Sequence, residues 1–81
     1  MSREEAVARL IETMCDVFDV DDLKFRDNMT ADDVDGWDSL SHVRFLIAVE
    51  RQFGLRFTSS EIDGFKNVGE IVDVIVQRAT L

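Results

Sequence analysis

Apolar residues recur every three or four positions in two long stretches of this chain, which is the spacing of one face of an α-helix. The first stretch predicts a helix from about Glu4 to Phe18, and Ser2 and Glu5 have capping-box spacing at its start. Its predicted buried face consists of Val7, Leu10, Ile11, Met14 and Phe18.

The second stretch predicts a helix from about Ser39 to Phe53 that ends at Gly54, because glycine readily adopts the left-handed conformation after a helix. By the same spacing, Phe45 and Val49 lie off its apolar stripe and are predicted to be half exposed. The stripe that we expect to be buried consists of Leu40, Val43, Leu46, Ile47 and Phe53.

Two further helices are predicted in the last third of the chain. An extended link, Leu55–Phe57, leads to Thr58, which caps a helix of one or two turns that runs to about Gly64. Asn67 then caps a last helix, with Glu70 at the capping-box position. The predicted inner face of that helix consists of Val68, Ile71, Val72, Ile75 and Ala79.

A long connection, residues 16–38, separates the first two helices and carries nine aspartates against Lys24 and Arg26. Few loops of this length inside a compact domain lack structure altogether, so we expect a helical turn between Thr30 and Val34. The residues expected to anchor the loop to the core are Val20, Leu23, Phe25, Met29 and Val34. The whole chain, residues 1–81, is therefore predicted to form one all-α domain, a four-helix bundle of three main helices, one short helix and a long first loop.

Charge and cysteine usage narrow the classes of partner. Seventeen acidic residues against nine basic ones give a net charge of −8, which argues against nucleic acid and anionic membrane surfaces and favours basic protein surfaces. Cys15 is the single cysteine, so an internal disulfide and a cysteine metal cluster are excluded, and no metal site is predicted. No apolar run suits a signal peptide or a membrane span. We expect a monomeric, cytoplasmic protein.

The most informative chemistry lies at the start of the second predicted helix, where Asp38 precedes Ser39. The first N–H groups of a helix lack intrahelical partners, and the helix dipole favours negative charge there. Ser39 is therefore well placed to carry a phosphate ester. An Asp-Ser pair at a helix start is also common capping chemistry, so the pair alone does not establish a modification.

Four stretches together resemble a known family: Gly36-Trp37-Asp38-Ser39-Leu40, Val49-Glu50-Arg51-Gln52-Phe53-Gly54, Phe57-Thr58 and Asn67-Val68. With the length, acidity and helix order of the whole chain, they look like an acyl carrier protein. The resemblance implies a free-standing carrier without catalytic activity. A phosphopantetheinyl transferase would attach a 4′-phosphopantetheine arm to Ser39 through a phosphodiester. The arm's thiol would hold acyl groups as thioesters for acyl-transferring, ketosynthase or ligase enzymes of fatty-acid, polyketide or related lipid biosynthesis.

The same resemblance implies roles for residues around the serine. Asp38 would cap the helix and help to present Ser39 to the transferase. Partner enzymes would contact Leu40, His42, Val43, Arg44 and Ile62. An acyl pocket between the second helix and the short helix would be lined by Leu46, Ile62, Phe65 and Ile71. The bulk of Phe65 predicts a shallow pocket or a cargo that stays outside it.

The second predicted helix departs from the acidic surface that fatty-acid carriers of this family usually present. Arg44 and Arg51 outweigh Glu50, so the helix has a net charge of +1, and His42 can add a further charge. This predicts a specialised carrier whose partners differ from those of bulk fatty-acid synthesis, because surface charges tune on-rate and partner choice. Ordinary solvated surface charge is the competing interpretation.

Other functions fit the sequence less well. An aminoacyl carrier, D-alanyl or peptidyl, stays open, although Val34-Asp35-Gly36-Trp37 lacks the Leu-Gly-Gly typical of peptidyl carriers. An EF-hand would need acidic ligands where Ala31 and His42 stand. Ser39 and His42 are one helical turn apart, but no Gly-x-Ser-x-Gly elbow surrounds the serine, which argues against a hydrolase. The last alternative is an unmodified helical interaction module.

Overall fold

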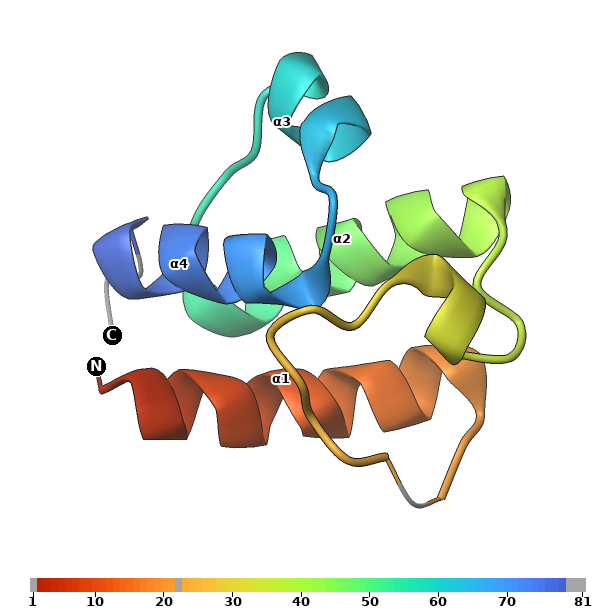
Figure 1. The fold of residues 1–81 in the computed structure, drawn as a ribbon. Coiled ribbons are helices and arrows are strands. Elements are labelled where there is room, and N and C mark those ends of the chain that lie inside the picture. Colours follow the sequence, from red (N-terminus) through yellow and green to blue (C-terminus); the bar gives the residue numbers. More distant parts are fainter. Residues whose placement is uncertain (1, 22, 79–81) are drawn as a thin grey trace.

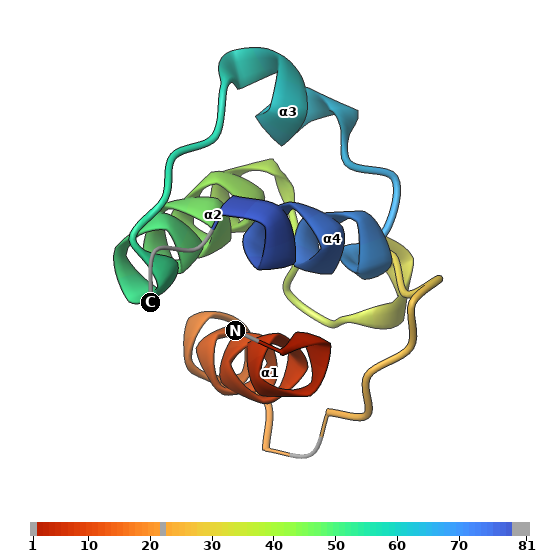
Figure 2. The same cartoon turned by 90° about the vertical axis from the view of Figure 1, so that its left-hand side faces the viewer.

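The computed structural model describes residues 2–21 and 23–78, and the described residues form helices without strands. The elements are α1 (Arg3–Phe18), the 3-10 turn η1 (Ala31–Asp33), α2 (Ser39–Phe53), α3 (Ser59–Gly64) and α4 (Val68–Arg78). In Figures 1 and 2, α1 forms one layer, α2 and α4 lie together above it, and α3 covers the side away from α1. The predicted all-α arrangement of three long helices and one short helix is confirmed. No helix in this part of the chain has the length and apolar character needed to cross a bilayer.

Local capping groups set the ends of the first two long helices as predicted. The Ser2 hydroxyl accepts the N–H of Glu5 at 3.1 Å at the start of α1. Gly54 follows α2 with φ 66°, and its N–H donates to the carbonyl of Glu50 at 3.0 Å. Asp19 takes the same left-handed conformation after α1, with φ 55°.

The two later helices also begin with capping side chains. Thr58 and Glu61 exchange hydrogen bonds, each side chain accepting the other residue's N–H, which is a complete capping box. Asn67 Oδ1 accepts the N–H of Glu70 at 3.0 Å. The Glu70 carboxylate, however, accepts the N–H of Lys66 at 2.8 Å, one residue before the predicted partner.

The hydrophobic core lies between α1 and the layer of α2 and α4, as the contacts of α1 with both helices show. On α1, Val7 and Ile11 are only half-buried, whereas Ala6 and Thr13 are buried. The other three predicted α1 core residues are buried, namely Leu10, Met14 and Phe18. The loop anchors are confirmed: Met29 and Val34 are buried, and the remaining three pack against the core, namely Val20, Leu23 and Phe25. On α4, the described members of the predicted inner face are all buried, whereas Ala79 lies outside the described residues.

The structure corrects the predicted buried face of α2. Phe45 and Val49, which were predicted to be half exposed, have 0% exposed surface. Most of the predicted buried stripe lies outside: Leu40 is 68% exposed, and Val43 and Ile47 are each 43% exposed. The members of that stripe that do lie in the core are Leu46 and Phe53.

Two apolar faces compete on α2, and charge decides between them. Phe45 and Val49 are one turn apart and belong to the face that packs against the core beneath them. Turning the helix to bury Ile47 would also bury Arg44 and Arg51, which lie about one turn before and after it. Burying unpaired guanidinium groups costs far more than leaving aliphatic side chains in water, so the other face is buried.

The long loop docks on the first turn of α4. Val68 and Gly69 donate their N–H groups to the carbonyls of Met29, at 2.8 Å, and Asp27, at 2.9 Å. These donors have no partner inside a helix, so the loop supplies what α4 lacks. Arg3 of α1 binds the Asp27 carboxylate at 2.7 Å. The loop that leads to Ser39 is therefore held from two helices.

Candidate functional site at the start of α2

Ser39 is the first residue of α2, and its side chain is exposed. Asp38 caps the helix as predicted, because its carboxylate accepts the N–H of Ser41 at 2.8 Å. This hydrogen bond holds the pKa of Asp38 below its ordinary value. The cap therefore stays ionised at neutral pH, next to the serine hydroxyl.

Gly36 and Trp37 direct the chain into α2. Gly36 has φ 85°, a left-handed conformation that favours glycine. The Trp37 ring stacks on Phe18, with 5.0 Å between ring centroids, and meets Phe45 edge-on at 5.5 Å. Trp37 lies two residues before Ser39, so packing in the core fixes where the serine emerges.

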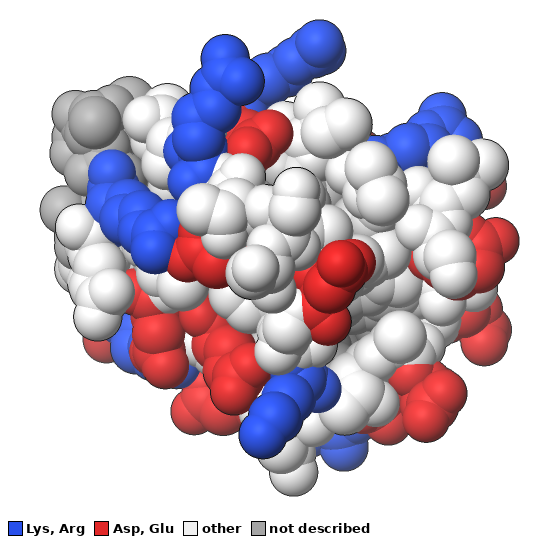
Figure 3. Space-filling model, turned by 90° about the horizontal axis from the view of Figure 1, so that it is seen from above, with Lys and Arg blue, Asp and Glu red and all other residues white. Residues whose placement is uncertain are grey.

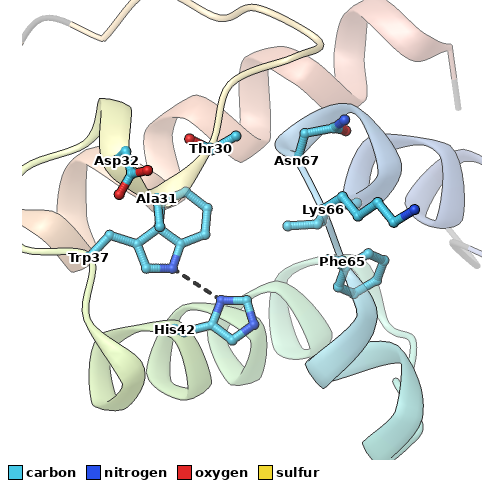
Figure 4. Close-up of a pocket in the computed structure, with 9 residues that line it drawn as sticks. Thr30, Ala31, Asp32, Trp37, His42, Phe65, Lys66 and Asn67 are labelled. Atoms are coloured by element: carbon cyan, nitrogen blue, oxygen red, sulfur yellow. Dashed lines mark hydrogen bonds between the residues drawn. The ribbon is translucent and has the colours of Figure 1, made fainter.

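His42 joins the turn formed by Gly36 and Trp37, here called the entry turn, to α3. Its Nδ1 accepts the indole N–H of Trp37 at 3.0 Å, and Figure 4 shows the two rings facing each other at one side of a hollow. Its Nε2 lies 2.8 Å from the carbonyl oxygen of Ile62. Since Nδ1 accepts the indole N–H, Nε2 is the ring nitrogen that donates to the carbonyl of Ile62. His42 is therefore a half-buried bridge between the entry turn and α3.

An open hollow of about 510 Å³ adjoins Ser39. Of the predicted partner-binding residues, His42, Val43 and Ile62 line it, and Leu40 and Arg44 are exposed on the same helix. The rest of its lining consists of Ala31, Trp37, Asp38 and Asp63. The structure thus brings the serine, its cap and most of the predicted partner contacts to one place.

A second, smaller hollow of about 210 Å³ lies between the long loop and the α3–α4 link, and Figure 4 shows it. Two of the predicted acyl-pocket residues, Phe65 and Ile71, line it. Leu46 is 1% exposed within the core, and its part in an acyl pocket stays a prediction. Sequence reasoning missed the rest of the lining, which includes Thr30, Trp37, Lys66 and Asn67. For Trp37 a signal existed, since it is the single tryptophan and immediately precedes Asp38.

Charge is distributed unevenly around the site. In Figure 3, most basic side chains on the visible face lie towards the upper edge, and most acidic ones lie at the lower left and the right. On α2, Arg44 and Arg51 are exposed and border a shallow depression with Ile47. The predicted basic character of this helix is therefore expressed on its outer surface.

Two comparisons with known proteins agree with this geometry. Residues 8–75 match the family described as the phosphopantetheine attachment site. The chain is also 36% identical over 77 residues to an acyl carrier protein of Acidothermus cellulolyticus, an alignment that covers 93% of this chain and 89% of that protein. Proteins of this kind carry covalently attached 4′-phosphopantetheine and have no catalytic activity of their own. An exposed serine on a capped helix, the family match and this similarity lead to one conclusion: the chain belongs to the acyl carrier protein family.

Proposed function

We propose that Ser39 carries the phosphopantetheine arm and that this chain presents acyl groups to enzymes of fatty-acid, polyketide or related lipid biosynthesis. The observation that supports this most directly is the exposed Ser39 hydroxyl at the first position of α2. When attached, the arm supplies a terminal thiol that holds the acyl group as a thioester. In this proposal the carrier acts as a cytoplasmic monomer and receives its arm from a phosphopantetheinyl transferase.

The surroundings of Ser39 fit a phosphodiester. The N–H groups of the first turn of α2 and the helix dipole favour a negative group at this end. Asp38 holds that turn in a defined conformation through Ser41, so the backbone that carries the Ser39 hydroxyl is fixed as a transferase approaches. The open hollow beside Ser39 leaves room for an arm.

The outer stripe of α2, made up of Leu40, Val43 and Ile47, supports a role in docking partner enzymes. These exposed aliphatic side chains run along one face of the helix and begin next to Ser39. Arg44 and Arg51 border the stripe, so the partner surface that fits it is apolar at the centre and acidic at the edge. Such partners differ from the basic enzymes that acidic fatty-acid carriers meet.

The attachment site can be tested by the intact mass of the protein after incubation with coenzyme A and a broad-specificity transferase. Wild type should gain one arm, and Ser39→Ala should gain none because the accepting hydroxyl is gone. Ser41→Ala is the matched control, since it removes a hydroxyl two residues away but keeps the backbone N–H that Asp38 binds. A wild type that stays unmodified, or a Ser39→Ala variant that gains an arm, would contradict the proposal. The mass of the thioester on protein purified from its native host then separates acyl from aminoacyl cargo.

A further inference from the structure

The hollow beside Ser39, here called the outer hollow, and the smaller hollow lined by Phe65 and Ile71, the inner hollow, share part of their lining. Ala31, Trp37 and His42 line both of them. The first lies beside the serine, and the second extends from the shared residues to Phe65 and Ile71. The side chains of Trp37 and His42 therefore form the wall between the serine and the inner hollow. The direct way from Ser39 into the inner hollow, between α2 and α3, therefore passes this wall.

The wall is hydrogen-bonded from end to end. Trp37 Nε1 donates to His42 Nδ1 at 3.0 Å, and the two rings stack with 5.9 Å between centroids and 22° between planes. His42 Nε2 donates to the Ile62 carbonyl at 2.8 Å. Both bonds are partly shielded from water, so opening the wall leaves polar groups of three elements without partners. The bonds join the entry turn, α2 and α3.

The position of α3 depends on few contacts, of which this chain of bonds is one. None of the six residues of α3 is buried, and Figure 1 shows the helix set apart from the two-helix layer below it. Ile62 packs half-buried against the core. At the other side of the helix, Glu61 forms an ion pair with Arg78 of α4. Moving α3 away from α2 beside the serine therefore requires breaking the His42–Ile62 hydrogen bond.

We propose that the Trp37–His42–Ile62 bridge is a latch that keeps cargo attached at Ser39 out of the interior, so that this carrier presents its cargo in the outer hollow. This inference rests on the proposed function of Ser39. It assigns the carrier to acyl groups that need no burial, namely short or polar ones. The lining of the inner hollow is partly polar, with Thr30, Asp32, Lys66 and Asn67.

The test compares how fast neutral hydroxylamine cleaves an octanoyl thioester on the carrier and on octanoyl-coenzyme A. The carrier is loaded with the octanoyl arm by a broad-specificity transferase, and cleavage is followed by intact mass. On wild type, the rate should match that of octanoyl-coenzyme A within about twofold, because an unsequestered thioester spends its time exposed. On His42→Leu, which fills the space but makes no hydrogen bond, cleavage should be at least about fivefold slower as the chain withdraws.

Two further variants keep the result interpretable. Trp37→Phe retains a ring but loses the indole N–H, so it should also slow cleavage if His42→Leu fails to fold. Gln52 of α2 is exposed and lines neither hollow, so the thioester on Gln52→Leu should be cleaved as on wild type. Failure of wild type to load overturns the proposed function and the latch with it. A wild type that loads and protects octanoate, or latch variants that load and fold but do not protect it, overturn the latch alone.

Discussion

Trp37 couples the hydrophobic core to the functional site through a single side chain. Its ring packs on Phe18 and Phe45, and its N–H donates to His42. The sequence correctly predicted that α2 begins at Ser39 and that Asp38 caps it, because capping involves residues two or three positions apart. It did not predict the role of Trp37, because the ring partners of that residue come from α1 and α2 and meet only in the folded chain.

At the residue scale, the corrected face of α2 predicts opposite outcomes for two apolar truncations. Phe45→Ala should lower the free energy of unfolding by about 3–5 kcal/mol, because the ring is fully buried and its loss leaves a cavity. Leu40→Ala should change it by less than about 0.5 kcal/mol, because the side chain is 68% exposed. Urea unfolding followed by circular dichroism measures both values. Equal losses in the two variants would contradict the assignment of the buried face.

At the element scale, α3 is attached mainly by polar groups. Its Glu61 carboxylate binds Arg78 of α4 and accepts the N–H of Thr58, and these bonds lower the pKa of Glu61 to about 2. The sequence predicted this helix from its capping box, which is local. It could not predict the tie to Arg78, because that contact joins two separate helices.

A second element-scale feature is the close approach of α4 to the long loop. A Cβ at Gly69 would lie 2.6 Å from the Asp27 carbonyl oxygen, so Gly69→Ala should destabilise the fold by about 1–3 kcal/mol. Gly64→Ala is the matched control, because no atom lies within 4 Å of the new Cβ. We expect it to leave stability unchanged or to raise it by up to about 1 kcal/mol. Thermal unfolding of both variants checks this. Equal melting temperatures would show that the long loop can shift away from the new Cβ without loss of stability.

At the scale of the whole molecule, the charges are separated by region. The chain has a net charge of −8, and nine aspartates lie in residues 16–38, yet α2 exposes Arg44 and Arg51. A partner that docks on α2 therefore meets local positive charge on an acidic protein. Rim charges of this kind act mainly on the association rate.

This separation predicts that Arg44→Glu improves turnover of the loaded carrier by general fatty-acid synthesis enzymes. Their basic surfaces should associate faster with a more acidic α2, raising kcat/KM roughly a few-fold at low ionic strength. The gain should shrink at high salt, because exposed charges are screened. Lys24→Glu makes the same charge change in the long loop and should have little effect. Unchanged kcat/KM in Arg44→Glu, or an equal gain in both variants, would argue against a docking role for α2.

The sequence alone determined the helices, their caps and the position of Ser39, because these depend on contacts within a few residues along the chain. It also marked the loop anchors, because apolar side chains in an acidic loop are best buried against the core. The tertiary structure decided which face of α2 is buried and where His42 points. Both faces of α2 satisfy the helical period, and only packing against the core, with Arg44 and Arg51 kept in water, selects one of them. The bridge from Trp37 through His42 to Ile62 joins groups that only the fold brings within hydrogen-bonding distance.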